Sequence, residues 1–234
     1  MSPALYLIPV ELGDTSQERV LPSYNREVIL GIRYFIVEEL RSARRFLKRV
    51  DKDINIDALT FFPMGKHADA ALFERYLKPL ETGESVGVIS EAGCPAVADP
   101  GADVVAIAQR KGLRVVPLVG PSSMIMAVMA SGLNGQSFAF NGYIPVKPDE
   151  RKSALKALEK RSFHQTQILI ETPYRNDSLL KDMLTTLSPS TRLCIAANIT
   201  CPDQFIRTLT VAQWKKLQGF TIGKRPCVFL IQAQ

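Results

Sequence analysis

Two loops rich in small residues stand where strand-like segments pass into helix-like segments. The first is "SEAGCPAVADPG", residues 90–101, which follows the apolar run "VGVI"; the second is "GPSSM", residues 120–124, which follows "RVVPLV". Few side chains in either loop can act as an acid or a base, whereas glycine and other small residues let the backbone approach a ligand closely. Strand ends of a parallel sheet open on one side, so we expect both loops to line one crevice.

The same loops lack the usual phosphate-binding motifs. Neither contains GxGxxG, and the chain has no GxxxxGK[ST] segment. The dinucleotide fingerprint and the phosphate-binding loop of nucleoside triphosphatases are therefore absent. The loops favour a ligand that is held by backbone groups and small side chains.

Four carboxylates near the expected crevice are candidates for a general base: Glu11, Glu91, Asp103 and Glu171. We expect Glu11 to be a solvated loop residue, and Asp103 to complement the dipole in the first turn of a helix. Glu171 ends the strand-like segment "QILIE" and is the carboxylate most expected to face the ligand. The base itself stays unassigned, with Glu171 as a candidate catalytic residue.

A basic cluster, "RSARRFLKR", lies in the helix-like segment 41–49. Its cations are spaced so that they share adjoining faces of one helix, and they are Arg41, Arg44, Arg45 and Lys48. Such a face is either solvated or binds phosphates of RNA. Lys147 and Arg175 are further candidates for phosphate contacts, and Tyr143 is expected in the core.

The elements that must position these residues alternate in the first half of the chain. Short apolar segments at 4–10, 85–90 and 114–120 are separated by amphipathic segments, including the long stretch 26–50. In the loop 90–101, Asp99 can cap the next helix, with Pro100 at its first position. The alternation predicts a mostly parallel, doubly wound α/β sheet over residues 1–118.

The pattern of strand-like and helix-like segments changes after Gln136. Five strand candidates are more closely spaced, with helices expected only at 150–160, 176–187 and 211–217. This density predicts a second α/β domain, residues 119–234, with a mixed sheet and helices.

Bulk composition limits the functional classes. The 234 residues are 46% hydrophobic and carry a net charge of +6, which favours anionic partners such as RNA or a polycarboxylate. The four cysteines form no CxxC pair and there are only two histidines, so we expect no metal site. Apolar runs are too short to span a membrane, and a strand-like segment begins almost at the N-terminus, which predicts a cytoplasmic protein without a membrane partner.

The two loops together resemble the class III S-adenosylmethionine-dependent methyltransferases, the tetrapyrrole methylase superfamily. The similarity is greatest to the branch that 2′-O-methylates a cytidine ribose of small-subunit ribosomal RNA. "LYLIPVELGD" is similar to that branch's "TPIGNL" segment, "VEELRSARRFLK" to its "EDTR" helix, "FNGYIP" to its "GF.P" strand end and "ETPYR" to its "ES..R" motif.

The resemblance implies a cofactor, S-adenosylmethionine, held between two domains. It implies cofactor contacts at Pro9, Ala92, Gly93, Cys94, Val97, Ala98, Pro121, Ser122, Ser123, Glu171, Ile199, Thr200 and Pro226. Methyl transfer from a sulfonium requires alignment and exclusion of water more than it requires acids or bases, which accounts for the chemistry of the loops. The family also implies a homodimer.

The chain departs from the RNA-methylating branch in three segments. Ala197 and Asn198 replace the usual Arg-Glu, the "HEHN" stretch is represented by "GKHA" around His67, and "KRPC" replaces the terminal "GE" motif. The segments "CPDQ" and "RPCVFLI" look more like those of tetrapyrrole-methylating relatives. The leading hypothesis is 2′-O-methylation of small-subunit ribosomal RNA; the alternatives are methylation of a precorrin-type tetrapyrrole and a catalytically silent module that binds nucleotide or RNA.

Overall fold

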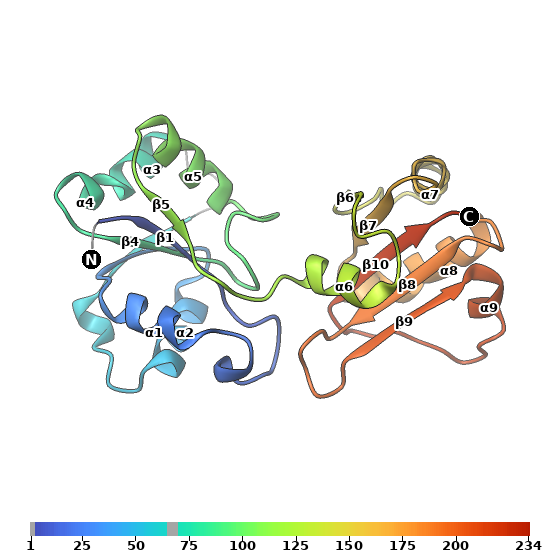
Figure 1. The fold of residues 1–234 in the computed structure, drawn as a ribbon, viewed down its shortest axis with the longest axis horizontal. Coiled ribbons are helices and arrows are strands. Elements are labelled where there is room, and N and C mark those ends of the chain that lie inside the picture. The colour runs from blue at the N-terminus through green and yellow to red at the C-terminus, as the bar shows by residue number, and fades with distance from the viewer. Residues whose placement is uncertain (1–2, 65–69) are drawn as a thin grey trace. The chain divides into compact units, whose positions relative to one another are not determined.

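The computed structural model describes residues 3–64 and 70–234, so the stretch around His67 lies outside the described residues. The chain divides into two compact units, Met1–Ser122 and Ser123–Gln234, called unit 1 and unit 2 below (Figure 1). Each unit is built around its own five-stranded sheet.

Unit 1 contains a fully parallel sheet with the strand order β3-β2-β4-β1-β5. Its strands are β1 (Leu5–Ile8), β2 (Tyr34–Val37), β3 (Thr60–Pro63), β4 (Val86–Ile89) and β5 (Val115–Pro117). Its helices are η1 (Gln17–Arg19), α1 (Ser23–Leu30), α2 (Leu40–Val50), η2 (Ile56–Ala58), α3 (Ala70–Tyr76), α4 (Lys78–Glu81) and α5 (Gly101–Arg110). The predicted parallel α/β sheet is confirmed.

Both faces of this sheet are buried, because successive strand residues point to opposite sides. Tyr6 and Phe35 belong to one hydrophobic cluster, whereas their neighbours Leu5 and Ile36 belong to another. Helices therefore cover the sheet on two sides, as a doubly wound arrangement requires.

Strand β2 corrects the sequence interpretation, which took residues 26–50 as one amphipathic stretch. Gly31 ends α1, and the run Tyr34–Val37 then pairs in parallel with both β3 and β4. Aromatic and β-branched side chains fit a buried pleated surface better than a helix. Strand β3, which pairs with β2 at the edge of the sheet, was also not predicted.

Unit 2 contains the expected mixed sheet, ordered β6-β7-β10-β8-β9. Its strands are β6 (Phe138–Phe140), β7 (Thr166–Ile170), β8 (Arg192–Ala197), β9 (Phe205–Thr210) and β10 (Cys227–Gln232). Its helices are α6 (Ser123–Ser131), α7 (Pro148–Arg161), η3 (Pro173–Arg175), α8 (Asn176–Thr186) and α9 (Val211–Lys215). Only β6 and β7 are parallel; the other pairs are antiparallel.

The core of unit 2 lies between this sheet and helices α7, α8 and α9. Trp214 is buried in it, and its indole Nε1 donates a hydrogen bond to the carbonyl oxygen of Leu193 at 2.8 Å. Phe205 and Phe220 pack against the same indole ring. This aromatic group fixes α9 against β8.

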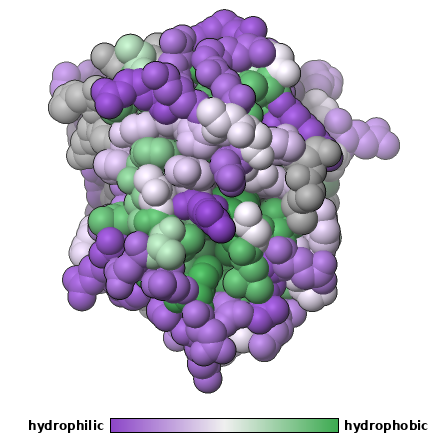
Figure 2. Space-filling view, turned by 90° about the vertical axis from the view of Figure 1, so that its left-hand side faces the viewer, coloured by the Kyte–Doolittle hydropathy of each residue, from purple (hydrophilic) through white to green (hydrophobic). Residues whose placement is uncertain are grey.

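The surface is chemically mixed. On the face shown in Figure 2, hydrophilic residues surround smaller patches of hydrophobic ones. Within residues 3–64 and 70–234, no helix is both long and apolar enough to cross a membrane.

Gly87 in the central strand β4 provides a test of the packing in unit 1. A Cβ atom there would lie 2.6 Å from Ile8 Cδ1 and 3.0 Å from Phe35 Cδ1, so the Gly87→Ala substitution overpacks the core. We expect it to lower the free energy of unfolding by about 1 to 3 kcal/mol in urea denaturation. The control is Gly31→Ala, whose Cβ would meet only the Val28 carbonyl at 3.5 Å. Equal stability of the two variants would contradict this account of the sheet.

Candidate cofactor and substrate site

Three loops at the carboxyl ends of β4, β1 and β5 are joined by hydrogen bonds in unit 1. The backbone amide of Val10, after β1, donates to the carbonyl oxygen of Gly93, after β4, at 3.0 Å. The thiol of Cys94 donates to the carbonyl oxygen of Pro121, after β5, at 3.4 Å. The two glycine-containing loops identified in the sequence therefore meet at one edge of the sheet, on either side of the loop after β1.

The glycines in these loops permit contacts between the loops themselves. Gly93 has a φ of +72°, and a Cβ atom there would lie 3.1 Å from Leu12 Cδ2 and 3.3 Å from the oxygen of Pro121. A Cβ atom on Gly120 would lie 2.3 Å from both Cβ and Cγ of Pro9. Both positions require glycine for packing, whatever ligand the loops bind.

Two alanines of the loop after β4 adopt left-handed backbone conformations. The φ angles are +63° at Ala96 and +60° at Ala98. Such angles cost about 1 to 2 kcal/mol per non-glycine residue and are concentrated at functional sites. Asp99 Oδ1 helps to hold this conformation, because it accepts hydrogen bonds from the amides of Ala96 and Gly101, both at 2.8 Å.

The start of α5 differs slightly from the sequence expectation. The helix begins at Gly101, with Pro100 at its N-cap, one position before the expected one. Asp99 still accepts the first helical amide, so its predicted capping role is retained. Asp103 lies in the first turn of α5, as expected.

Glu11 is not the solvated residue that the sequence suggested. Its side chain is only 5% exposed and forms an ion pair with Arg49 of α2 at 3.2 Å. A second hydrogen bond, at 3.3 Å, joins Arg49 Nε to Glu11 Oε1. An isolated buried carboxylate is costly, so the arginine on the neighbouring helix is what permits its burial.

Glu38 is a carboxylate that sequence reasoning missed. Burial raises the pKa of Glu38, the charge of Asp99 raises it further, and a hydrogen bond from the Glu91 amide offsets part of the increase. These neighbours place Glu38 beside the loop after β4. Recognising β2 would have revealed it, because Glu38 directly follows that buried strand.

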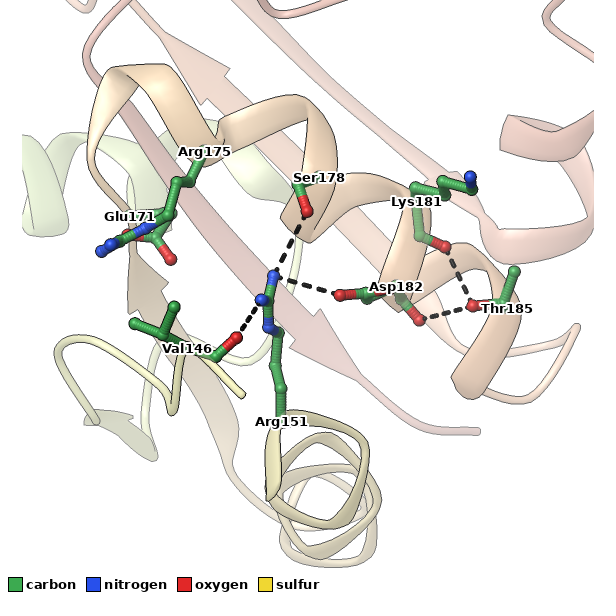
Figure 3. Close-up of polar contacts among 8 residues, drawn as sticks. All are labelled: Val146, Arg151, Glu171, Arg175, Ser178, Lys181, Asp182 and Thr185. Carbon is green, nitrogen blue, oxygen red and sulfur yellow. Dashed lines mark hydrogen bonds and ion pairs between the residues drawn. The ribbon is translucent and has the colours of Figure 1, made fainter. Parts of the chain in front are cut away.

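In unit 2, Glu171 and Arg175 form an ion pair at the carboxyl end of β7 (Figure 3). Glu171 Oε1 accepts hydrogen bonds from Arg175 and from the amide of Thr172, both at 2.7 Å. Two buried atoms of the pair, Glu171 Oε2 and Arg175 Nε, have no hydrogen-bond partner among the residues that the structure describes. Buried polar atoms are normally paired, so these two atoms are positions where a ligand could bind.

The charge of Glu171 is set by opposing effects. Burial raises the pKa of Glu171, but the hydrogen bonds from Arg175 and Thr172 and the charges of Arg175 and Arg151 outweigh it, so the pKa is lowered. Glu171 therefore stays ionised at neutral pH. A carboxylate with a lowered pKa is a weak proton acceptor, which makes Glu171 better suited to bind than to act as a base.

Arg151 holds the loop between β6 and α7 against α8 (Figure 3). It donates to the carbonyl oxygen of Val146, and it pairs with Asp182 at 3.1 Å and bonds Ser178 Oγ at 3.4 Å. The loop carries Tyr143, which is 61% exposed, so its expected place in the core is wrong. Tyr143 instead lies near Arg175.

The other predicted contacts of unit 2 gather at the same edge of the sheet as Glu171. The amide of Asn198 donates to the carbonyl oxygen of Pro226 at 2.9 Å, which joins the segment after β8 to the start of β10. Register places Val228 of β10 opposite Ile170 of β7. Asn198 and Thr200 have φ angles of +47° and +75°, so this edge also contains left-handed residues.

The predicted phosphate-binding residues differ in their availability. Arg44 lies over the Phe61 ring, Lys48 Nζ bonds the Lys52 carbonyl and Lys147 pairs with Glu150. Arg41 and Arg45 are exposed, and neither side chain forms a hydrogen bond or ion pair with the described part of the chain. These two arginines are the most available for an anionic partner.

The lowered pKa of Glu171 leads to a prediction about stability and pH. The ionised pair stabilises the fold above the ordinary carboxylate range, and its contribution is lost as the pH falls through the lowered pKa of the folded state. Glu171→Gln should therefore lower the free energy of unfolding at pH 7 by about 1 to 3 kcal/mol, and the deficit should shrink in acid. Urea denaturation between pH 3 and pH 7 measures this; a deficit that does not vary with pH would contradict the assignment.

Comparisons with known proteins identify the family of the chain. The family model described as Tetrapyrrole (Corrin/Porphyrin) Methylases matches residues 27–214. The Ribosomal RNA small subunit methyltransferase I of Vibrio cholerae is 31% identical over 91% of this chain and 70% of its own length. The protein of the same name from Escherichia coli O157:H7 is 28% identical over 94% of this chain and 70% of its own length.

Among solved structures, the methyltransferase CobJ aligns with a TM-score of 0.63 over 99% of this chain and 95% of its own. At 14% identity it supports the fold alone. The family model covers most of the chain, including the loops after β4 and β5 that the sequence singled out. The chain belongs to the tetrapyrrole methylase family.

Proposed function

We propose that this protein is an S-adenosylmethionine-dependent methyltransferase that 2′-O-methylates a ribose in small-subunit ribosomal RNA. The observation that carries the proposal is the similarity to proteins named Ribosomal RNA small subunit methyltransferase I, which extends over 90% or more of the chain in several bacteria. The basic face of α2 supports a nucleic-acid substrate.

The residues present fit the cofactor. In unit 1 the small side chains leave the backbone accessible, and Val97 and Ala98 are exposed. In unit 2 the unpartnered atoms of Glu171 and Arg175 can hydrogen-bond a polar ligand. The proposed contacts are Pro9, Ala92, Gly93, Cys94, Val97, Ala98, Pro121, Ser122, Ser123, Glu171, Ile199, Thr200 and Pro226.

When bound, S-adenosylmethionine supplies a methyl group on a positively charged sulfur. The residues of this chain have to align the acceptor hydroxyl with that methyl group and exclude water, because a displacement at carbon depends mainly on geometry. The hydroxyl proton must also leave. Glu38, with its raised pKa, is better suited than Glu171 to accept it.

The proposed substrate and family indicate where the protein acts and how it assembles. Ribosomal subunits are cytoplasmic, so we propose that the protein acts in the cytoplasm, and the family resemblance supports a homodimer. Light scattering after size-exclusion chromatography measures the oligomeric state.

A small tetrapyrrole is the second candidate acceptor. Ala197 and Asn198 and the segment "KRPC" depart from the RNA-methylating pattern.

Ligand binding tests the cofactor. S-adenosylmethionine or S-adenosylhomocysteine should raise the melting temperature, because a ligand present at 100 times Kd stabilises the fold by about 2.7 kcal/mol. Thermal denaturation with each compound, and with ATP as the control, measures this. Incubation with undermethylated small subunits should then release S-adenosylhomocysteine. Binding without turnover on any acceptor would indicate a silent module and contradict the proposed activity.

Salt dependence tests the RNA substrate. Arg41 and Arg44 line a surface depression of about 320 Å³ together with Leu40 and Arg45. The double variant Arg41→Ala, Arg45→Ala removes the two arginines that are most available, so it should bind small-subunit RNA fragments less tightly and reduce the slope of log K against log salt by up to about one per lost phosphate contact.

The control for this experiment carries the same change in charge elsewhere. Lys156 and Lys160 are exposed on α7, and replacing both by alanine should leave the slope unchanged. Fluorescence anisotropy across a salt series measures all three proteins. An identical slope in all three would exclude the α2 face from RNA binding.

A further inference from the structure

A cavity of about 230 Å³ lies between α2 and the loops after β1 and β4. Its floor is apolar and consists of buried residues, namely Val10, Ala43, Phe46 and Ile89. Its polar lining residues are Glu11, Ser42, Arg45, Arg49, Ser90 and Glu91. The cavity therefore offers both apolar surface and polar groups to a small polar ligand.

The cavity adjoins the loop proposed to hold the cofactor. Ala92, one of the proposed cofactor contacts, lines it, and Gly93 follows directly. The amide of Val10 on the floor bonds the carbonyl oxygen of Gly93 at 3.0 Å. A group held in this cavity therefore lies next to the loop proposed to bind the methyl donor.

The Glu11–Arg49 pair forms one wall of the cavity and has unused hydrogen-bonding capacity. A carboxylate can accept about four hydrogen bonds, and from the described residues Glu11 accepts two, both from Arg49 and both longer than 3 Å. Carboxylates also hydrogen-bond ribose hydroxyls in nucleotide-binding proteins. The pair can therefore accept from, and donate to, a ribose.

Arg45 lines the same cavity, one helical turn before Arg49. Its side chain is exposed and forms no hydrogen bond or ion pair with the residues described in the structure. A guanidinium in this state is well suited to bind a phosphate. Arg45 and Arg49 are one helical turn apart. A phosphate bound by Arg45 would therefore lie next to a hydroxyl group bound by the Glu11–Arg49 pair.

We propose that this cavity binds one ribonucleotide of the RNA substrate, with Glu11 and Arg49 on its ribose hydroxyls and Arg45 on its phosphate. The inference rests on the proposed function. It also names the residues that would select RNA over DNA, because the 2′-hydroxyl is the group that distinguishes the two nucleic acids.

The test compares an RNA and a DNA oligonucleotide of the same small-subunit sequence, with binding measured by fluorescence anisotropy at one salt concentration. The unsubstituted protein should bind the RNA about 10-fold or more tightly than the DNA, as expected for hydrogen bonds to a charged group. In Glu11→Gln the two affinities should differ by no more than about 2-fold. Arg45→Ala should weaken both complexes by a similar factor and leave the ratio unchanged.

The matched control is Glu81→Gln, which removes a carboxylate from another ion pair of unit 1, the one with Lys111 at 2.6 Å. It should leave both affinities unchanged. S-adenosylmethionine binding, measured by calorimetry, should be the same in all variants. A merely structural role of Glu11 would lower the melting temperature without changing the ratio of RNA to DNA affinity.

Photocrosslinking supplies a second measurement that does not depend on a variant. RNA containing 4-thiouridine should crosslink to peptides with residues 10–13 or 42–49 in the unsubstituted protein. An unchanged ratio in folded Glu11→Gln, or crosslinks confined to other peptides, would overturn this inference while methylation of the subunit still stood. Absence of both RNA binding and methylation would instead overturn the proposed function.

Discussion

The hydrogen bond between the Val10 amide and the Gly93 carbonyl is the contact on which the arrangement of unit 1 depends. It forms an isolated antiparallel bridge beyond the ends of the parallel strands β1 and β4 and brings two loops together. The Cys94 thiol then connects the loop after β4 to the loop after β5. Because these links are made by the chain itself, they restrict the conformations of the three loops of unit 1, which reduces the entropy lost when a ligand binds to them.

Unit 2 is constrained by charged side chains that are buried at one edge of its sheet. Glu171 is completely buried at its side chain, and Arg175 neutralises it from the next turn of the chain. Arg151, also buried, is paired with Asp182 and bonded to the Val146 carbonyl. Removing one partner of such a pair leaves an uncompensated buried charge, so these ion pairs fix the loops after β6 and β7 in one conformation.

The sequence predicted the fold where periodicity and turn residues agreed. All five strands of unit 2 follow apolar runs bounded by turn residues, and all five are present. Strand β2 could not be recognised in the same way, because four apolar residues between two amphipathic helices fit either period. That single omission concealed Glu38, whose position becomes apparent only once β2 is placed beside β4.

Pairwise contacts at the site were beyond sequence reasoning for a related reason. Glu11 and Arg49 are 38 residues apart, and nothing local in the chain indicates that they meet. Spacing within the segment 41–49 predicted a basic helix face, but not that Arg44 would lie over the Phe61 ring while Arg45 formed no hydrogen bond or ion pair with the described residues. Periodicity describes one element at a time, whereas these contacts depend on how α2 packs against the sheet.

The contact of Gly120 with Pro9 limits how this protein can evolve. Any side chain at position 120 would overlap both Cβ and Cγ of the proline, so the two positions cannot vary independently. A residue larger than glycine at position 120 therefore requires a smaller residue at position 9 or a shift of one of the two loops. Divergence in ligand preference must then arise at neighbouring positions that are free to vary, such as the exposed Val97 and Val119.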